Sequence, residues 1–281
     1  MMKSFKLYAF ADEASSNIDE QIKAMKRNGL SGLEIRNVDG ENVAKISLEK
    51  AKEVKEKLDA AGLITFSIGS PIGKIKITDE FAAHLDSFKH CLEIAAILGA
   101  KNFRLFSFYT PKGEDPSPYK DEVLERLSRF CEAAEGSKVT LCHENEKGIY
   151  GDLAPRCLQI HEAIPQLKAI FDPANYVQCH QDTLEAYELL KDHIHYLHIK
   201  DSLKDGSIVP AGKGVGNIKE ILSKTRASDL TIEPHLKVFD GLGELEDDSK
   251  SDEEKLKNVY TYSSNDEAFD AACKHLKELI K

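Results

Sequence analysis

The hexapeptide VTLCHE, at residues 139–144, is a short apolar run that ends in a potential metal ligand. Runs of this length and composition are typical of buried strands. Three later stretches follow the same plan, and the potential ligands at the ends of the four runs are Glu144, Asp172, His198 and Glu233. Successive ligands lie 28, 26 and 35 positions apart, which leaves room for one helix between strands. The pattern therefore predicts a strand–helix alternation with one polar residue at each strand end.

Parallel neighbouring strands bring their carboxyl ends to one edge of a sheet. Three carboxylates and an imidazole that meet there repel one another unless a cation lies between them. The alternative is that each acid caps the following helix, a role that suits Asp172 because Pro173 follows it. Four such positions on four successive strands favour the first interpretation. The sequence thus predicts a divalent metal site at the C-terminal mouth of a barrel.

The whole chain repeats the same alternation. Before residue 139, strands are predicted at residues 5–10, 32–36, 63–69 and 102–107. The predicted helices span residues 17–28, 47–61, 81–98, 119–134, 154–164, 183–190, 218–223 and 266–280. Eight strand–helix units predict a single (β/α)8 TIM barrel over residues 1–281, since this fold takes about 250 residues. An open doubly wound sheet is the alternative, disfavoured because no G-x-G-x-x-G follows the first strand.

Composition narrows the class of partner and the compartment. The formal net charge of −10 disfavours nucleic acid as a partner. Six cysteines without a C-x-x-C pair are typical of reduced thiols in a cytoplasmic protein. We find neither a signal-peptide core nor an apolar stretch of about 18 residues, so no membrane association is expected. The acidic insert at 242–255 is predicted to be a solvated loop. Oligomeric state stays open, with a homo-oligomer among the options.

The glycine-rich stretch GKGVG at residues 212–216 is interpreted as a mobile loop at the mouth. Phosphate binding is its weaker alternative, because the stretch comes late in the chain and lacks the phosphate-loop pattern.

The predicted donor set of three carboxylates and one imidazole favours a hard or borderline ion with open positions. Mn²⁺ and Mg²⁺ fit best, and Co²⁺ and Zn²⁺ remain compatible. Because no cysteine belongs to the set, a closed structural zinc site is disfavoured.

Four motifs give the chain a specific resemblance: HEN at 143–145, FDPAN at 171–175, HIKD at 198–201 and IEPH at 232–235. The sequence resembles the xylose-isomerase-like TIM-barrel superfamily, in particular its sugar phosphate isomerase/epimerase family. The resemblance implies one divalent metal ion and a small carbohydrate substrate. In members that act on ketoses, the metal binds two adjacent sugar oxygens and two glutamates move a proton at the carbon between them. Carried over, Glu144 and Glu233 would be both metal ligands and catalytic acid/base groups.

Two positions depart from the pattern of relatives. Several relatives have a histidine where this chain has Asn175, and those with a Glu-Asn-His motif have one where it has Glu146. The exact reaction is therefore open. The missing histidines also disfavour the multi-zinc endonuclease branch.

The residues expected to contact substrate are Lys200, Glu146, Arg104 and Glu34. Lys200 lies two residues beyond His198, on the same face of an extended segment. Its alternative role is a salt bridge with Asp201 or another acid. Glu34 has a similar alternative, since it could pair with Arg36. Arg104 reaches the mouth only if its strand has the right register.

These observations leave several functions in contention. The first is a divalent-metal-dependent isomerase or epimerase of a ketose, sugar phosphate or related polyol, using carboxylate-mediated proton transfer. The second is a metal-dependent dehydratase, a lyase, of an inosose-like keto-polyol, with Lys200 or a carboxylate assisting loss of water. An endonuclease IV-like phosphodiesterase is disfavoured by charge. A non-catalytic sugar-binding protein is the fourth, if no metal binds.

Overall fold

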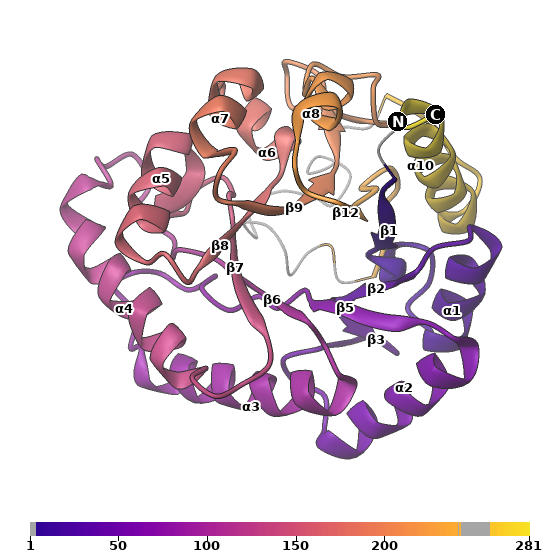
Figure 1. The fold of residues 1–281 in the computed structure, drawn as a ribbon, viewed down its shortest axis with the longest axis horizontal. Coiled ribbons are helices and arrows are strands. Elements are labelled where there is room, and N and C mark those ends of the chain that lie inside the picture. The colour runs from indigo at the N-terminus through magenta and orange to yellow at the C-terminus, as the bar shows by residue number, and fades with distance from the viewer. Residues whose placement is uncertain (1–3, 241, 243–258) are drawn as a thin grey trace.

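The computed structural model describes residues 4–240, 242 and 259–281. Eight parallel strands close into a barrel in the order β1-β12-β9-β8-β7-β6-β5-β2, with helices around the ring (Figure 1). The strands are β1 (Lys6–Ala9), β2 (Gly32–Ile35), β5 (Ile64–Ile68), β6 (Asn102–Leu105), β7 (Thr140–Glu144), β8 (Lys168–Phe171), β9 (Ile194–Ile199) and β12 (Asp229–Ile232). The predicted (β/α)8 barrel is confirmed, and it places the first and last strands side by side.

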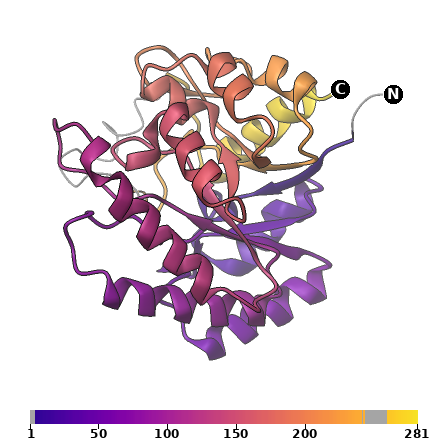
Figure 2. The same ribbon diagram turned by 60° about the vertical axis from the view of Figure 1, so that its left-hand side comes forward.

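The helices cover the outside of the barrel, as Figure 2 shows from the side. They are α1 (Ile18–Arg27), α2 (Leu48–Ala61), α3 (Ala82–Leu98), α4 (Lys120–Ala133), α5 (Ala154–Ala163), α6 (Pro173–Gln178), α7 (Thr183–Leu190), α8 (Ile218–Lys224) and α10 (Asn265–Leu279). Local chemistry sets their ends. The Asn17 side chain accepts hydrogen bonds from two backbone N–H groups of α1, and Gly62 ends α2 with a positive φ of 71°.

Several short elements were not predicted, and three of them lie near the mouth or beside it in the chain. Two are hairpins, β3 (Asn37–Val38) with β4 (Glu41–Asn42) and β10 (Asp201–Ser202) with β11 (Ile208–Val209). Two-residue strands carry no periodic pattern that the sequence could reveal. The third is α6, which begins directly after β8. Its N-cap is Asp172, so the capping role considered for this residue is real.

The acidic insert predicted at 242–255 lies, apart from Leu242, outside the described residues. Among the helices that the structure describes, none has the length and hydropathy that crossing a membrane requires.

The barrel interior holds a small cluster of its own, separate from the main core between strands and helices. It consists of Tyr8, Phe66, Cys142, Ile170 and Tyr196, which come from five different strands. The rings of Tyr8 and Phe66 stack with centroids 3.8 Å apart, and Tyr196 meets Phe66 edge-on. The Tyr196 hydroxyl donates a hydrogen bond to Glu34 at 3.0 Å. This aromatic layer therefore connects the core to the polar groups at the mouth.

Candidate metal centre

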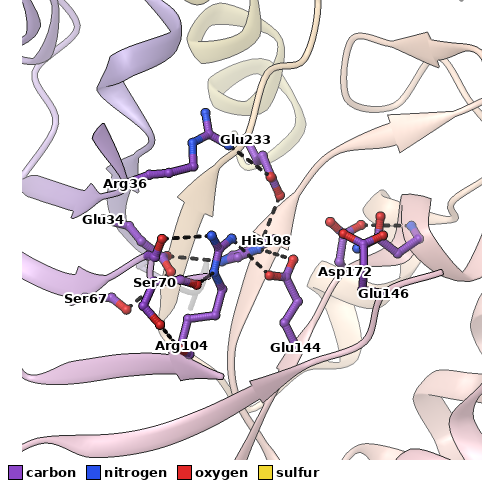
Figure 3. A network of polar contacts seen from close by, with 12 residues as sticks. Glu34, Arg36, Ser67, Ser70, Arg104, Glu144, Glu146, Asp172, His198 and Glu233 are labelled. Atoms are coloured by element: carbon purple, nitrogen blue, oxygen red, sulfur yellow. Dashed lines mark hydrogen bonds and ion pairs between the residues drawn. The ribbon is translucent and has the colours of Figure 1, made fainter. Parts of the chain in front are cut away.

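Four side chains from the last four barrel strands meet at the C-terminal mouth. Glu144 ends β7, His198 is the penultimate residue of β9, and Asp172 and Glu233 directly follow β8 and β12. One ligand atom from each of the four lies within 4.8 Å of those of the others, and all four residues are buried. The structure therefore brings together the residues that were predicted to share a metal ion (Figure 3). That they hold one remains a proposal.

The imidazole of His198 lies between carboxylates on both sides. Its Nδ1 is 2.8 Å from Glu144 Oε1 and 3.3 Å from Glu233 Oε2, whereas its Nε2 is 3.1 Å from Glu34 Oε2. Burial alone would lower the pKa of His198, but the charges of Glu144 and Glu34 outweigh it and hold the pKa well above its usual value. A ring nitrogen that donates to Glu34 leaves the other nitrogen directed at the cluster.

Each of the two glutamates is also held by an arginine, Arg104 of β6 or Arg36, which directly follows β2. Arg104 Nη1 lies 3.0 Å from Glu144 Oε2, and Arg36 Nη1 lies 3.6 Å from Glu233 Oε1. Both guanidinium groups stack on the ring of Phe10, at 5.0 Å and 4.6 Å from its centroid. Each glutamate thus keeps one oxygen near His198 and the other against an arginine.

Asp172 divides its two oxygens between two tasks. Its Oδ1 accepts a hydrogen bond from the backbone N–H of Asn175 at 3.1 Å and so caps α6. Its backbone is fixed by Asn145, whose side chain bonds both the N–H and the carbonyl of Asp172. The buried Oδ2 takes part in no regular hydrogen bond but lies 2.9 Å from the Lys200 ammonium. Burial raises the pKa of Asp172 to about 7, with Lys200 opposing the rise and the neighbouring carboxylates adding to it.

Lys200 belongs to the cluster electrostatically. Its Nζ lies 3.3 Å from Glu233 Oε2 as well as close to Asp172, and its side chain is 5% exposed. The salt bridge considered from the sequence is therefore present, but its partners are Asp172 and Glu233 and not Asp201. Asp201 instead accepts hydrogen bonds at 2.8, 3.0 and 3.0 Å from backbone N–H groups of the glycine-rich loop, at Gly212, Gly214 and Gly216. The loop's donors thus bind a side chain of this chain, which leaves them unavailable to a phosphate.

The other residues expected to contact substrate differ in their partners and in their exposure. Glu34 is fully buried and bonds His198, Ser67 and Tyr196. Arg104 bonds Glu144 and the carbonyl groups of Gly69 and Ser70. Glu146 is the most exposed, at 15% of its side chain, and pairs with Lys74 at 3.1 Å.

Sequence reasoning missed a second acidic cluster beside the first. Glu13, Glu233 and His235 bring their ligand atoms within 4.8 Å of one another. Arg36 lies among them, with its Nε 2.8 Å from Asp12 and its Nη2 3.1 Å from Glu13. The signal was present, because Asp12 and Glu13 follow the first strand as the predicted ligands follow later strands.

The donor chemistry of the first cluster fits a divalent cation. Carboxylate oxygens and an imidazole nitrogen are ligands that Mn²⁺, Mg²⁺ and Zn²⁺ accept, and these donors do not select one ion. The buried Asp172 Oδ2, without a hydrogen bond, supplies an oxygen that a cation can take up.

Comparison with known proteins agrees with this architecture. A family model described as xylose isomerase-like TIM barrel matches residues 22–252. A search of curated protein sequences finds no match.

Solved structures with the same fold share little sequence. One is the probable 3-DHS dehydratase AsbF from Bacillus anthracis, with a TM-score of 0.73, 16% identity and 98% of each chain covered. Another is D-psicose 3-epimerase with D-tagatose from Clostridium cellulolyticum H10, with a TM-score of 0.73, 14% identity and coverage of 98% of this chain and 99% of the other. The IOLI protein with a bound zinc atom has a TM-score of 0.72, 15% identity and 98% coverage of each chain.

At these identities the solved structures establish the fold alone, whereas the family model matches most of the sequence. The chain belongs to the xylose isomerase-like TIM barrel family.

Proposed function

We propose that the protein is a divalent-metal-dependent isomerase or epimerase of a ketose, sugar phosphate or related keto-polyol. One observation carries the proposal. Glu144 and Glu233 come from strands separated by β8 and β9, and each directs one oxygen toward His198 Nδ1 while an arginine holds the other. Two fixed carboxylates on either side of one position suit a proton transfer between two faces of a carbon atom.

Each residue has a distinct task in this proposal. Glu144, Asp172, His198 and Glu233 hold the ion, which when bound stabilises negative charge on adjacent substrate oxygens. One glutamate takes a proton from the carbon between those oxygens, and the other returns one. Glu146 and Lys200 bind substrate hydroxyl groups. Glu146 is more exposed than Glu144 and Glu233, and Lys200 lies beside Glu233. Arg104 borders the same position through its contact with Glu144, whereas Glu34 lies behind His198 at Nε2 and orients the ring.

Replacement of the glutamates tests the proposal. In a screen of ketoses with and without phosphate, supplemented with Mn²⁺ or Mg²⁺, Glu144→Gln and Glu233→Gln should each lower kcat by about a thousandfold, because an amide cannot accept the proton. Loss of substrate deuterium to solvent reports the same step. Glu220→Gln, an exposed glutamate on α8, is the matched control. Full activity in either mouth variant would eliminate the mechanism.

A dehydratase is the second candidate, favoured by one contact. The Lys200 ammonium lies 3.3 Å from Glu233, so a carboxylate that removes a proton and a cation that can protonate a departing hydroxyl group lie side by side. The structural neighbour described as a probable 3-DHS dehydratase has the same fold. Mass spectrometry of products separates the candidates, because a dehydratase removes one water and an isomerase conserves the formula.

A further inference from the structure

The cation that joins Asp172 to Glu233 in the first cluster is a lysine with few contacts. The Nζ of Lys200 lies 2.9 Å from Asp172 and 3.3 Å from Glu233, which are two of the four proposed ligands. Only the second contact has hydrogen-bond geometry. An ammonium here occupies the side of the two carboxylates that a divalent ion would need.

The two carboxylates are fixed more firmly than the lysine. Asp172 is held by the α6 cap and by both bonds from Asn145. Glu233 is held by Arg36 at 3.6 Å and by His235 at 3.5 Å. Lysine, by contrast, has a flexible four-carbon stem and a compact charge. If a stronger cation enters, the group that moves is the ammonium.

We propose that Lys200 is a displaceable internal cation, which joins Asp172 to Glu233 in the metal-free protein and gives way when a divalent ion binds. This inference rests on the metal site of the proposed function. A buried pair of carboxylates needs a partner at all times, and Lys200 supplies it until the ion arrives. Lys200 therefore competes with the metal for two of its ligands and weakens metal affinity.

Glu146 is the next partner for the displaced ammonium. It acts on Lys200 electrostatically in the metal-free structure and has the most exposed carboxylate of the group. Movement toward Glu146 takes the ammonium from the ligands to the substrate side of the mouth, where a substrate oxygen can accept its hydrogen bond.

Metal binding to Lys200→Met tests the competition. After chelator treatment, calorimetric titration with Mn²⁺ and with Zn²⁺ should show about tenfold tighter binding than in the wild type, the equivalent of one charged hydrogen bond that no longer has to be broken. The metal-free variant should also melt several degrees lower, and saturating Mn²⁺ should close that gap. Lys191→Met, which removes an exposed lysine paired with Glu188 at the end of α7, is the matched control and should stay within about twofold of wild type.

Each outcome decides between the two proposals. Equal or weaker binding by Lys200→Met overturns displacement and leaves the metal site intact. Binding by neither protein overturns the proposed function itself. A second measurement uses only wild-type protein, so it does not depend on whether metal-free Lys200→Met folds. In an NMR spectrum of protein with ¹³Cε-labelled lysine, one equivalent of diamagnetic Zn²⁺ should shift the Lys200 resonance. An unshifted resonance in zinc-loaded protein would contradict displacement.

Discussion

The two acidic clusters at the mouth share Glu233 but differ in the cation between their acids. In the cluster of Glu13, Glu233 and His235, that cation is Arg36, which pairs with Asp12 and Glu13 and lies between two rings, 4.6 Å from Phe10 and 4.7 Å from Phe239. In the cluster of the four predicted ligands, the cation between Asp172 and Glu233 is Lys200, with two ion-pair contacts.

The difference teaches that acidic residues alone do not make a metal site. A planar guanidinium with several fixed hydrogen bonds and stacked rings is a permanent partner, because moving it would break all of these contacts together. A lysine ammonium is compact and can leave. We therefore expect the first cluster to exchange its cation for a metal, and the arginine cluster to hold Glu233 in place.

The largest expected effect follows removal of the permanent cation. Arg36→Met should lower the free energy of unfolding by about 3 kcal/mol, because it leaves buried carboxylates unpaired. We expect the lower end of the usual range, since burial already raises the pKa of Glu13 to about 8, with Arg36 opposing the rise, so that Glu13 readily takes up a proton. Urea denaturation of the metal-free protein measures the loss.

The comparison then depends on metal. Mn²⁺ should not restore the Arg36→Met variant to wild-type stability, in contrast with Lys200→Met. Arg226→Met, which removes an 88% exposed arginine, is the control and should change the free energy by less than about 0.5 kcal/mol. If Mn²⁺ restored the full stability of Arg36→Met, both clusters would exchange their cations, and the proposed difference between Arg36 and Lys200 would be wrong.

A smaller effect is expected from the carboxylate behind His198. Glu34→Gln replaces an ionised acceptor with a neutral amide at the 3.1 Å contact to Nε2. The ring then loses the partner that orients it and strengthens Nδ1 as a ligand, so affinity for Mn²⁺ should fall about tenfold. Calorimetry measures this directly.

The control for Glu34 is its hydroxyl partner. Ser67→Ala removes a hydrogen bond of 3.2 Å to Glu34 and leaves the carboxylate against His198, so affinity should change by less than about threefold. An unchanged affinity in Glu34→Gln would assign the orientation of His198 to Glu144 instead.

The sequence predicted the barrel and the four converging residues because both signals are local. An apolar run followed by a polar residue marks a strand end, and a parallel barrel brings every strand end to one mouth. Glu144, Asp172, His198 and Glu233 could be found in this way without any knowledge of their contacts.

The role of Arg36 could not be found in the same way. From the sequence, Glu34 appeared as its nearest partner, because the two residues lie two positions apart. In the structure Arg36 reaches Asp12 and Glu233, and it does so because closure places β1 between β2 and β12. Contacts that depend on closure join residues far apart in the chain, and no periodic pattern records them.

The smallest expected effect concerns His161, which lies outside both acidic clusters. Its protonation changes the free energy of unfolding with pH, and this change must be subtracted before the pH dependence of the two clusters is compared. Burial lowers its pKa to about 4, and its buried Nε2 has no hydrogen-bond partner among the described residues. In the unfolded chain His161 therefore takes up a proton near pH 6.5, whereas in the folded protein it stays neutral at that pH. The free energy of unfolding falls as the pH drops below 6.5. From pH 7.5 to pH 6 the contribution of His161 to this loss should be about 0.8 kcal/mol, and the total loss in His161→Gln should be smaller by that amount. Urea denaturation at both pH values checks this, with the exposed His180→Gln as control, and an unchanged difference in His161→Gln would refute the assignment.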